Sequence, residues 1–221
     1  MTSSGLVADV EADIRDFIAR QDELMFNEID FQIQLAIYLR GSGRYDDVDV
    51  EYSMPRTLID DYDWKSNLRI DIVVSRSGEY CPVELKYPTK GVTREIKRFG
   101  KFFPDTEVMK NHGAQDLVRY NYWKDVRRIE LLRRIFDSVH GGLAVLLTND
   151  MYYTRPVRAT SAAAPFSTHE GRCAGGGTMD WNGNPAVRPS HPSFTLDGVY
   201  AIRWTDAQID GVGFKYTIVK V

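Results

Sequence analysis

The sequence has few cysteines and no long apolar run. Cys81 and Cys173 are the only cysteines among 221 residues, and they lie in very different sequence contexts. A disulfide framework or a cysteine-based zinc site is therefore not expected, and a reducing compartment is favoured. No apolar stretch is long enough to span a bilayer, and the acidic N-terminus lacks the basic and apolar regions of a secretory signal. We expect a cytoplasmic protein with no membrane partner.

The chain also lacks a basic excess and internal repeats. Its net charge of −3 argues against non-specific coating of nucleic acid by the whole surface, but it leaves room for a local basic patch. Hydrophobic residues make up 43% and charged residues 27%, which is ordinary for a globular protein. The length suits one substantial core or at most two small domains, and we take residues 1–221 as a single domain.

Hydrophobic periodicity predicts alternating helices and strands. Residues 6–20 read as a helix, and Asp22 is a plausible N-cap for a second helix at 23–40 that ends at Gly41. The remaining predicted elements are strands at 48–54, 68–75 and 80–87, a long helix at 114–138, and strands at 143–149, 199–204 and 214–221. Residues 88–113 read as a basic loop or short helix, and 155–195 as loop. The order predicts an α/β fold in which helices flank a mixed sheet.

Charged residues interrupt the two apolar strands in RIDIVVSRSGEYCPVELKY, residues 69–87. In a hairpin with a turn at Ser77-Gly78, Asp71, Glu84 and Lys86 can converge at one edge of the sheet. Two neighbouring buried carboxylates repel each other unless a cation neutralises them. Oxygen ligands supplied by only two or three side chains suit Mg²⁺ or Mn²⁺. The alternative is a plain ion pair between Glu84 and Lys86, with Asp71 at the rim of the sheet.

Together with Glu28, which falls within the apolar stripe of the second predicted helix, these residues resemble the PD-(D/E)xK nuclease superfamily. That family has a restriction-endonuclease-like core of a helix, three strands, a helix and a strand. The resemblance covers about residues 22–150 and leaves about 151–221 as a C-terminal β extension. Arg69-Ile70 stand before Asp71, so the proline of the motif is missing.

The resemblance implies a role for each motif residue. Asp71, Glu84 and the backbone carbonyl of Leu85 would be metal ligands, and Glu28 would be an auxiliary ligand, often through water. Lys86 would position the attacking water. The implied cofactor is Mg²⁺ or Mn²⁺.

Further residues are candidates for contact with nucleic acid. The basic segment after Lys86 is interleaved with aromatic residues, which suits contact with phosphates, although a solvated charged loop explains it equally well. On the long helix an acidic residue and a tyrosine resemble a Gln-x-x-x-Tyr motif of some superfamily members, with the glutamine one place out of register. The candidates are Lys90, Arg94, Lys97, Arg98, His112, Gln115, Asp116 and Tyr120. Four arginines further along this helix, Arg127, Arg128, Arg133 and Arg134, are expected to form a solvated face.

The sequence thus predicts a Mg²⁺-dependent nuclease that hydrolyses phosphodiester bonds, with DNA favoured over RNA, and the resemblance suggests a defence or repair setting. The rival hypothesis is a catalytically inactive nucleic-acid-binding or assembly module that retains the fold. A different metal-dependent hydrolysis is a third alternative. Whether the chain acts alone, as a homodimer or in a larger complex is left open.

Overall fold

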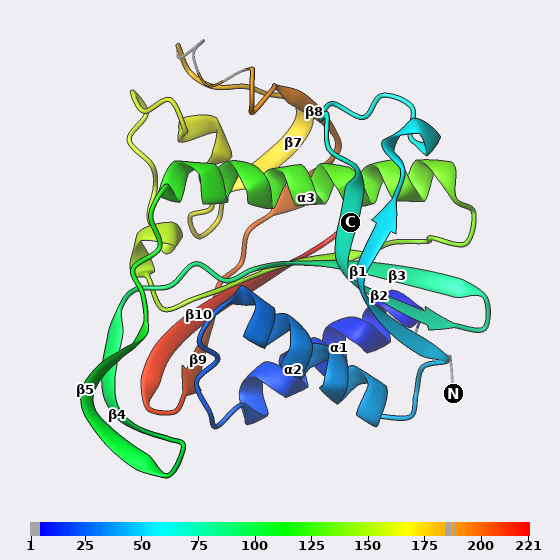
Figure 1. The fold of residues 1–221 in the computed structure, drawn as a ribbon. Coiled ribbons are helices and arrows are strands. Elements are labelled where there is room, and N and C mark those ends of the chain that lie inside the picture. The colour runs from blue at the N-terminus through cyan, green and yellow to red at the C-terminus, as the bar shows by residue number, and fades with distance from the viewer. Residues whose placement is uncertain (1–4, 184–186, 188) are drawn as a thin grey trace.

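The protein is described by a computed structural model that covers residues 5–183, 187 and 189–221. The first four residues, and positions 184–186 and 188 of the predicted loop, lie outside the described residues. The fold is mixed α/β, with a mixed central sheet flanked by helices (Figure 1). None of the helices within the described ranges is long and apolar enough to cross a membrane.

The helices and strands follow the predicted order closely. The α-helices are α1 (Leu6–Arg20), α2 (Glu28–Gly41) and α3 (Gln115–Ile135). The strands are β1 (Asp47–Met54), β2 (Leu68–Arg76), β3 (Glu79–Lys86), β4 (Val92–Arg98), β5 (Lys101–Met109), β6 (Leu143–Thr148), β7 (Cys173–Met179), β8 (Phe194–Ala201), β9 (Thr205–Ile209) and β10 (Val212–Lys220).

Among the described residues, six strands form the central sheet in the order β1-β2-β3-β6-β10-β9. Strands β3 and β6 run parallel, and the other neighbours are antiparallel. Strand β6 is buried along its whole length, as its continuous apolar sequence predicts. Because β9 and β10 extend this sheet beyond β6, the end of the predicted C-terminal extension belongs to the same sheet.

Helices cover both faces of the sheet. In Figure 1, α1 and α2 lie below the sheet and α3 lies above it, with the β7–β8 hairpin beyond α3. One apolar cluster joins α1 and α2 to the sheet, and a second, rich in aromatic rings, joins α3 to β6 and β8. Helix α3 is therefore buried on two sides, which is why four of its charged residues, Arg119, Asp125, Arg127 and Glu130, are buried.

Two glycine positions shape the frame around β3. Ser77 and Gly78 both have positive φ, so the β2–β3 turn has the left-handed geometry that favours tight hairpins. At the start of β6, a Cβ on Gly142 would lie 2.6 Å from the carbonyl oxygen of Pro82 and 2.6 Å from Ile129. Glycine thus permits β6 to approach both β3 and α3 closely.

Three local predictions were wrong. Residues 88–113, expected to be loop or short helix, contain the antiparallel hairpin β4–β5. The glycine-rich segment around residue 175, expected to be loop, forms β7 and pairs with β8. Helix α2 begins at Glu28 instead of residue 23, and its N-cap is Asn27 instead of Asp22, because the Asn27 side chain accepts a hydrogen bond from the Asp30 amide.

Candidate functional site

The β2–β3 hairpin brings the two predicted carboxylates together. Its register pairs Ile72 with Val83, so Asp71 and Glu84 are the next positions on adjacent strands. The β-branched residues on either side of Asp71 hold β2 inside the sheet. Both carboxylates are therefore fixed by backbone pairing and not by a loop.

Asp71 is largely buried and anchored to the next strand. Its Oδ2 accepts a hydrogen bond of 2.6 Å from the Leu85 amide, and its backbone carbonyl accepts one of 2.6 Å from Gln32. Burial raises the pKa of Asp71 to about 6, although the nearby Lys86 ammonium opposes this shift. A carboxylate held in such an environment binds a proton or a metal ion more readily than one in water.

Glu84 is the most deeply buried carboxylate of the site, with 1% of its surface exposed. Its Oε1 lies 2.9 Å from Nη1 of Arg128. Neither carboxylate oxygen accepts a well-directed hydrogen bond from the described residues. Burial raises the pKa of Glu84 well above its usual value, against the opposing effect of Arg128. A buried carboxylate without hydrogen bonds is costly, and native proteins seldom keep one without a reason.

Lys86 completes the motif and is directed toward α3. Its Nζ lies 2.7 Å from Oδ2 of Asp125 and donates a hydrogen bond of 2.8 Å to the Leu85 carbonyl. Burial lowers the pKa of Lys86, but the surrounding carboxylates, Asp125 first, outweigh burial and raise it above the ordinary value. The ammonium is therefore charged at all physiological pH values.

The sequence prediction missed Asp125 and Arg128. Arg128 was expected on a solvated face, yet it contacts Glu84, lies 3.1 Å from Oδ1 of Asp125 and donates to the backbone carbonyl of Arg69. Arg127 is buried as well, whereas Arg133 and Arg134 are exposed as expected. The i,i+3 spacing of Asp125 and Arg128 is visible in the sequence, but only packing against β3 shows that this pair faces the motif.

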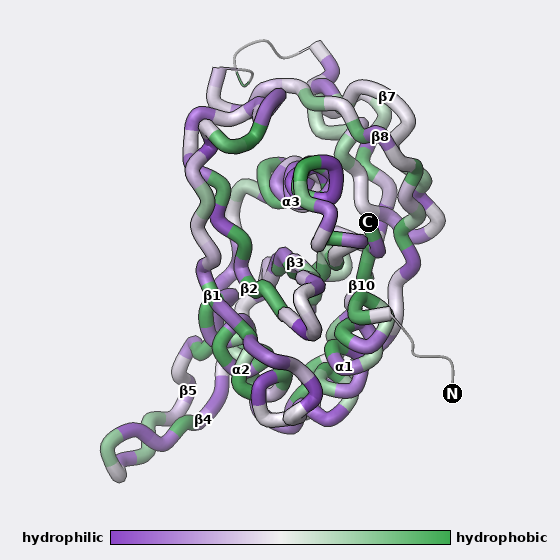
Figure 2. The backbone as a smooth tube through the Cα atoms, turned by 90° about the vertical axis from the view of Figure 1, so that its right-hand side faces the viewer, coloured by the Kyte–Doolittle hydropathy of each residue, from purple (hydrophilic) through white to green (hydrophobic). Residues whose placement is uncertain are grey.

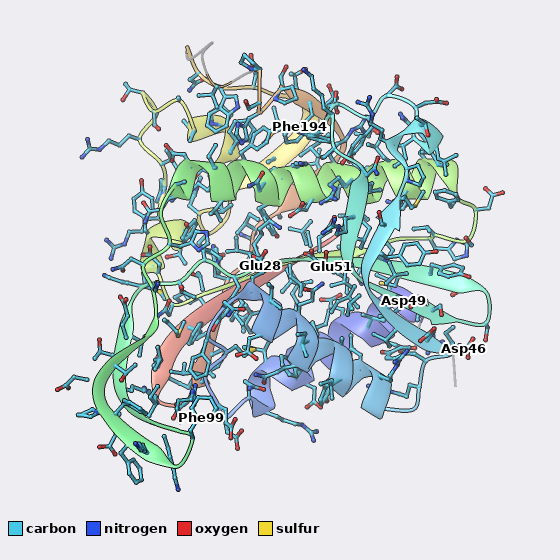
Figure 3. The ribbon with its side chains drawn as sticks, in the orientation of Figure 1. Glu28, Asp46, Asp49, Glu51, Phe99 and Phe194 are labelled. Atoms are coloured by element: carbon cyan, nitrogen blue, oxygen red, sulfur yellow. The ribbon has the colours of Figure 1, made fainter. Side chains whose placement is uncertain are left out.

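Glu28 approaches the motif from α2, on the face of the sheet opposite to α3 (Figure 1). It is the first residue of α2, not a residue in the middle of a helical stripe, and it lies at the end of that helix nearest to α3 (Figure 3). Its Oε2 accepts a hydrogen bond of 2.9 Å from the Tyr87 amide, directly after Lys86. Glu28 also contributes to the electrostatic environment of both Asp71 and Lys86.

A cavity of about 770 Å³ opens beside this group. Glu28, Lys86, Asp125 and Arg128 line it, whereas Asp71 and Glu84 lie behind these side chains. Lys124 and His112 also line the cavity, and burial lowers the pKa of Lys124. The wall therefore has charges of both signs, and Glu84, the most buried carboxylate, contacts it through Arg128.

The residues fit a small divalent cation. Across the described ranges, no group of three or more His, Cys, Asp or Glu side chains has the arrangement of a metal centre. Mg²⁺, however, needs only one or two carboxylates, because waters and substrate oxygens complete its shell. Three carboxyl groups, Asp71, Glu84 and Asp125, lie with only two cations, Lys86 and Arg128, and Glu84 accepts no hydrogen bond from the described residues. A bound cation would relieve both conditions.

The structure places the predicted nucleic-acid contacts in different environments. His112 lines the cavity, and Lys90, Lys97 and Arg98 are exposed. Arg94 is held by an ion pair with Asp210.

On α3, the Gln115 side chain donates a hydrogen bond of 3.0 Å to Asp150, and Asp116 is half-exposed. Tyr120 is fully buried, accepts a hydrogen bond from Trp64 and donates one to the Pro192 carbonyl. Its burial corrects the expectation that Tyr120 contacts nucleic acid: its ring belongs to the aromatic cluster.

Comparisons with family models, with curated protein sequences and with solved structures gave no match for this chain.

Proposed function

We propose that the protein is a metal-dependent nuclease of the PD-(D/E)xK type that hydrolyses phosphodiester bonds in DNA. The observation that carries the proposal is Glu84, a buried carboxylate beside Asp71 that accepts no hydrogen bond from the described residues and contacts Arg128 in the wall of a cavity. The order of helices and strands supports a restriction-endonuclease-like core. We assign the activity to the cytoplasm, where both cysteines would stay reduced.

Asp71, Glu84 and the Leu85 carbonyl would hold Mg²⁺ or Mn²⁺, with Glu28 as an auxiliary ligand through water. When bound, the ion supplies Lewis-acid activation of water and of the phosphate. The residues of the chain do the rest. Asp71 is fixed by the Leu85 amide and Glu84 by the β3 backbone, so both oxygen donors are positioned before substrate arrives.

Lys86 is the residue suited to orient the attacking water. Its ammonium stays charged and is held between the Leu85 carbonyl and Asp125, so it can donate a further hydrogen bond toward the cavity. Arg128 and Lys124 add positive charge to the same wall, where negative charge would build up on the phosphate in the transition state.

One observation favours the rival function, a nucleic-acid-binding module without catalysis. Lys86 is paired with Asp125, and Arg128 is paired with Glu84, so much of the buried charge is balanced by the chain itself. A structural ion-pair network of this kind needs no metal. The single carboxylate in excess favours the enzyme over this rival.

The deciding experiment is nicking of supercoiled plasmid in Mg²⁺ or Mn²⁺, with EDTA as the blank. Wild type should nick, and Asp71→Asn should not. Asp49→Asn, on the neighbouring strand β1 but exposed, is the matched control and should nick like wild type. Calorimetry should show Mn²⁺ binding to wild type and to Asp49→Asn but not to Asp71→Asn. Nicking that is absent in wild type, or unchanged in Asp71→Asn, would overturn the proposal.

A further inference from the structure

The hairpin β4–β5 projects from the body of the protein. Figure 2 shows it extending away from the sheet and helices at its lower left. Its base belongs to the candidate site, because Glu107, Val108 and Lys110 line the cavity. Arg98 packs over the ring of Phe26 at 5.2 Å, beside the start of α2. The β4–β5 hairpin, which we call the arm, thus connects the cavity wall to an exposed tip.

The tip combines aromatic rings with positive charge. Phe99 is fully exposed, and Phe102 and Phe103 expose 65% and 45% of their surface. Residues 96–104 include Lys97, Arg98 and Lys101 and no acidic residue. The Lys97 ammonium lies 5.5 Å from the centre of the Phe102 ring. Large exposed rings are costly in water, so three within five residues indicate a surface that is covered in use.

The turn itself is a poor choice for stability. Phe99 and Gly100 both have positive φ, the geometry in which Asn-Gly is strongly preferred. A bulky residue is strained there, and such strain persists where function requires the side chain. The ring of Phe99 lies at the end of the arm, away from the sheet (Figure 3). It therefore gains no burial that would offset the strain.

Strand pairing distributes rings and cations over both faces of the hairpin. Lys97 pairs with Phe102, while Ile96 pairs with Phe103 and Arg98 with Lys101. Side chains alternate between faces along a strand, so each face has at least one ring next to a cation. Flat rings beside cations suit a partner that offers both flat apolar surfaces and phosphates. Unpaired nucleobases meet this description, because every base has a face for stacking and every nucleotide has a charge.

We propose that the tip of the β4–β5 hairpin binds unpaired DNA bases by stacking on Phe99, Phe102 and Phe103, while Lys97, Arg98 and Lys101 contact the adjoining phosphates. The inference rests on the proposed nuclease function and assigns it a substrate class: DNA with a single-stranded arm, such as a fork or flap. The β4–β5 hairpin would hold the unpaired DNA strand while the neighbouring DNA backbone reaches the cavity at Glu28 and Lys86.

The test measures binding in EDTA to a forked DNA and to a blunt duplex of equal length. The fork contains a fluorescent adenine analogue in its single-stranded arm. Phe99→Asn suits the turn better than phenylalanine does, so the variant should fold at least as stably as wild type. It should bind the fork about tenfold more weakly, the effect of losing one base stack. The blunt duplex should be bound as before, and quenching of the analogue should decrease.

The triple variant Phe99→Ala, Phe102→Ala, Phe103→Ala should lose more than tenfold affinity for the fork. Val199→Ala is the control, because it removes an equally exposed apolar side chain from β8 and should change nothing. Fork affinity and quenching that are unchanged in both tip variants would overturn the inference, while plasmid nicking by the same preparations would leave the proposed function intact. Loss of binding to anionic vesicles with unchanged fork affinity would make the tip a membrane contact, and loss of self-association would make it an interface; either result overturns the inference. Wild type that binds neither DNA would overturn both proposals.

Discussion

Glu84 and Glu130 are two buried glutamates on packed elements, β3 and α3, and they differ in the hydrogen-bond donors around them. Glu130 lies on α3 and exposes 6% of its surface, against 1% for Glu84 on β3. Both carboxylate oxygens of Glu130 are fully bonded: Oε1 accepts from the Gly198 amide and the Tyr200 hydroxyl, each at 2.8 Å, and Oε2 accepts from Arg127 and the Asp197 amide. Within the described part of the chain, Glu84 has one ion pair and no hydrogen bonds.

The two glutamates differ in whether the protein itself satisfies their carboxylate oxygens. Glu130 ties α3 to β8, and each of its oxygens has two donors, so nothing is left for a ligand. The oxygens of Glu84 accept no hydrogen bond from the described residues, and Oε1 has only the ion pair with Arg128. Burial alone therefore does not distinguish the two glutamates; the hydrogen-bond donors around each carboxylate do.

The largest expected effect is on catalysis, in Glu84→Gln. The amide of glutamine is neutral and cannot supply the negative charge with which a carboxylate binds a metal ion. Plasmid nicking should therefore fall about a thousandfold. The free energy of unfolding without metal should stay the same or rise, because a buried charge has been removed. Nicking rates and urea titrations on the same preparation provide both values. A variant that nicks like wild type but unfolds early would make Glu84 a structural residue like Glu130.

Glu130→Ala should show the reverse. Arg127, the Gly198 amide and the Tyr200 hydroxyl lose their acceptor, and truncating one partner of a buried charged network costs about 3–5 kcal/mol. Urea unfolding measures this loss. At a temperature where the variant is still folded, its nicking rate should match wild type. A large loss of activity in the folded variant would contradict the distinction between the two glutamates.

Lys86→Ala sharpens the comparison on the catalytic side. Losing one preorganised charge should lower the turnover rate by about a hundredfold. Because Asp125 is then left buried without its ammonium, the variant should also unfold at lower urea. Lys65→Ala, an exposed cation that is not among the residues lining the cavity, is the control and should change neither value appreciably. Full activity in a destabilised Lys86→Ala would make Lys86 a structural partner of Asp125.

The smallest expected effect is a pH dependence of the aromatic cluster. His191 packs against the ring of Tyr120, and burial, followed by the charge of Lys124, lowers the pKa of this histidine. Because protonation is disfavoured in the folded state, the contribution of His191 to stability is present above its unfolded pKa of about 6.5 and is lost as the pH falls below that value. His191→Gln should flatten the slope of unfolding free energy between neutral and mildly acidic pH. An identical slope in the variant would assign it to other groups.

Much of the frame could be predicted from local pattern. The Ser77-Gly78 turn between β-branched runs specified the β2–β3 hairpin, and with it the adjacency of Asp71 and Glu84. The uninterrupted apolar run at Leu143–Thr148 specified a strand buried on both faces. These are short-range signals, and nearby residues are sufficient to produce them.

Other local patterns misled. The segment 88–113 is charged and lacks a regular alternation of apolar and polar residues, because its hairpin projects into solvent and buries little. The start of α2 was misplaced because Asp22 and Asn27 are both good caps by residue type. Only the packing of the chain before α2 determines which of them is used.

Local sequence was sufficient to place two carboxylates and a lysine on neighbouring strands joined by a tight turn. Tertiary structure decided their charge environment. Asp125 and Arg128 reach Lys86 and Glu84 only because α3 packs across β3, some forty positions later in the chain. The pKa of a buried group and the donors available to it depend on neighbours in space, and these can come from any part of the sequence.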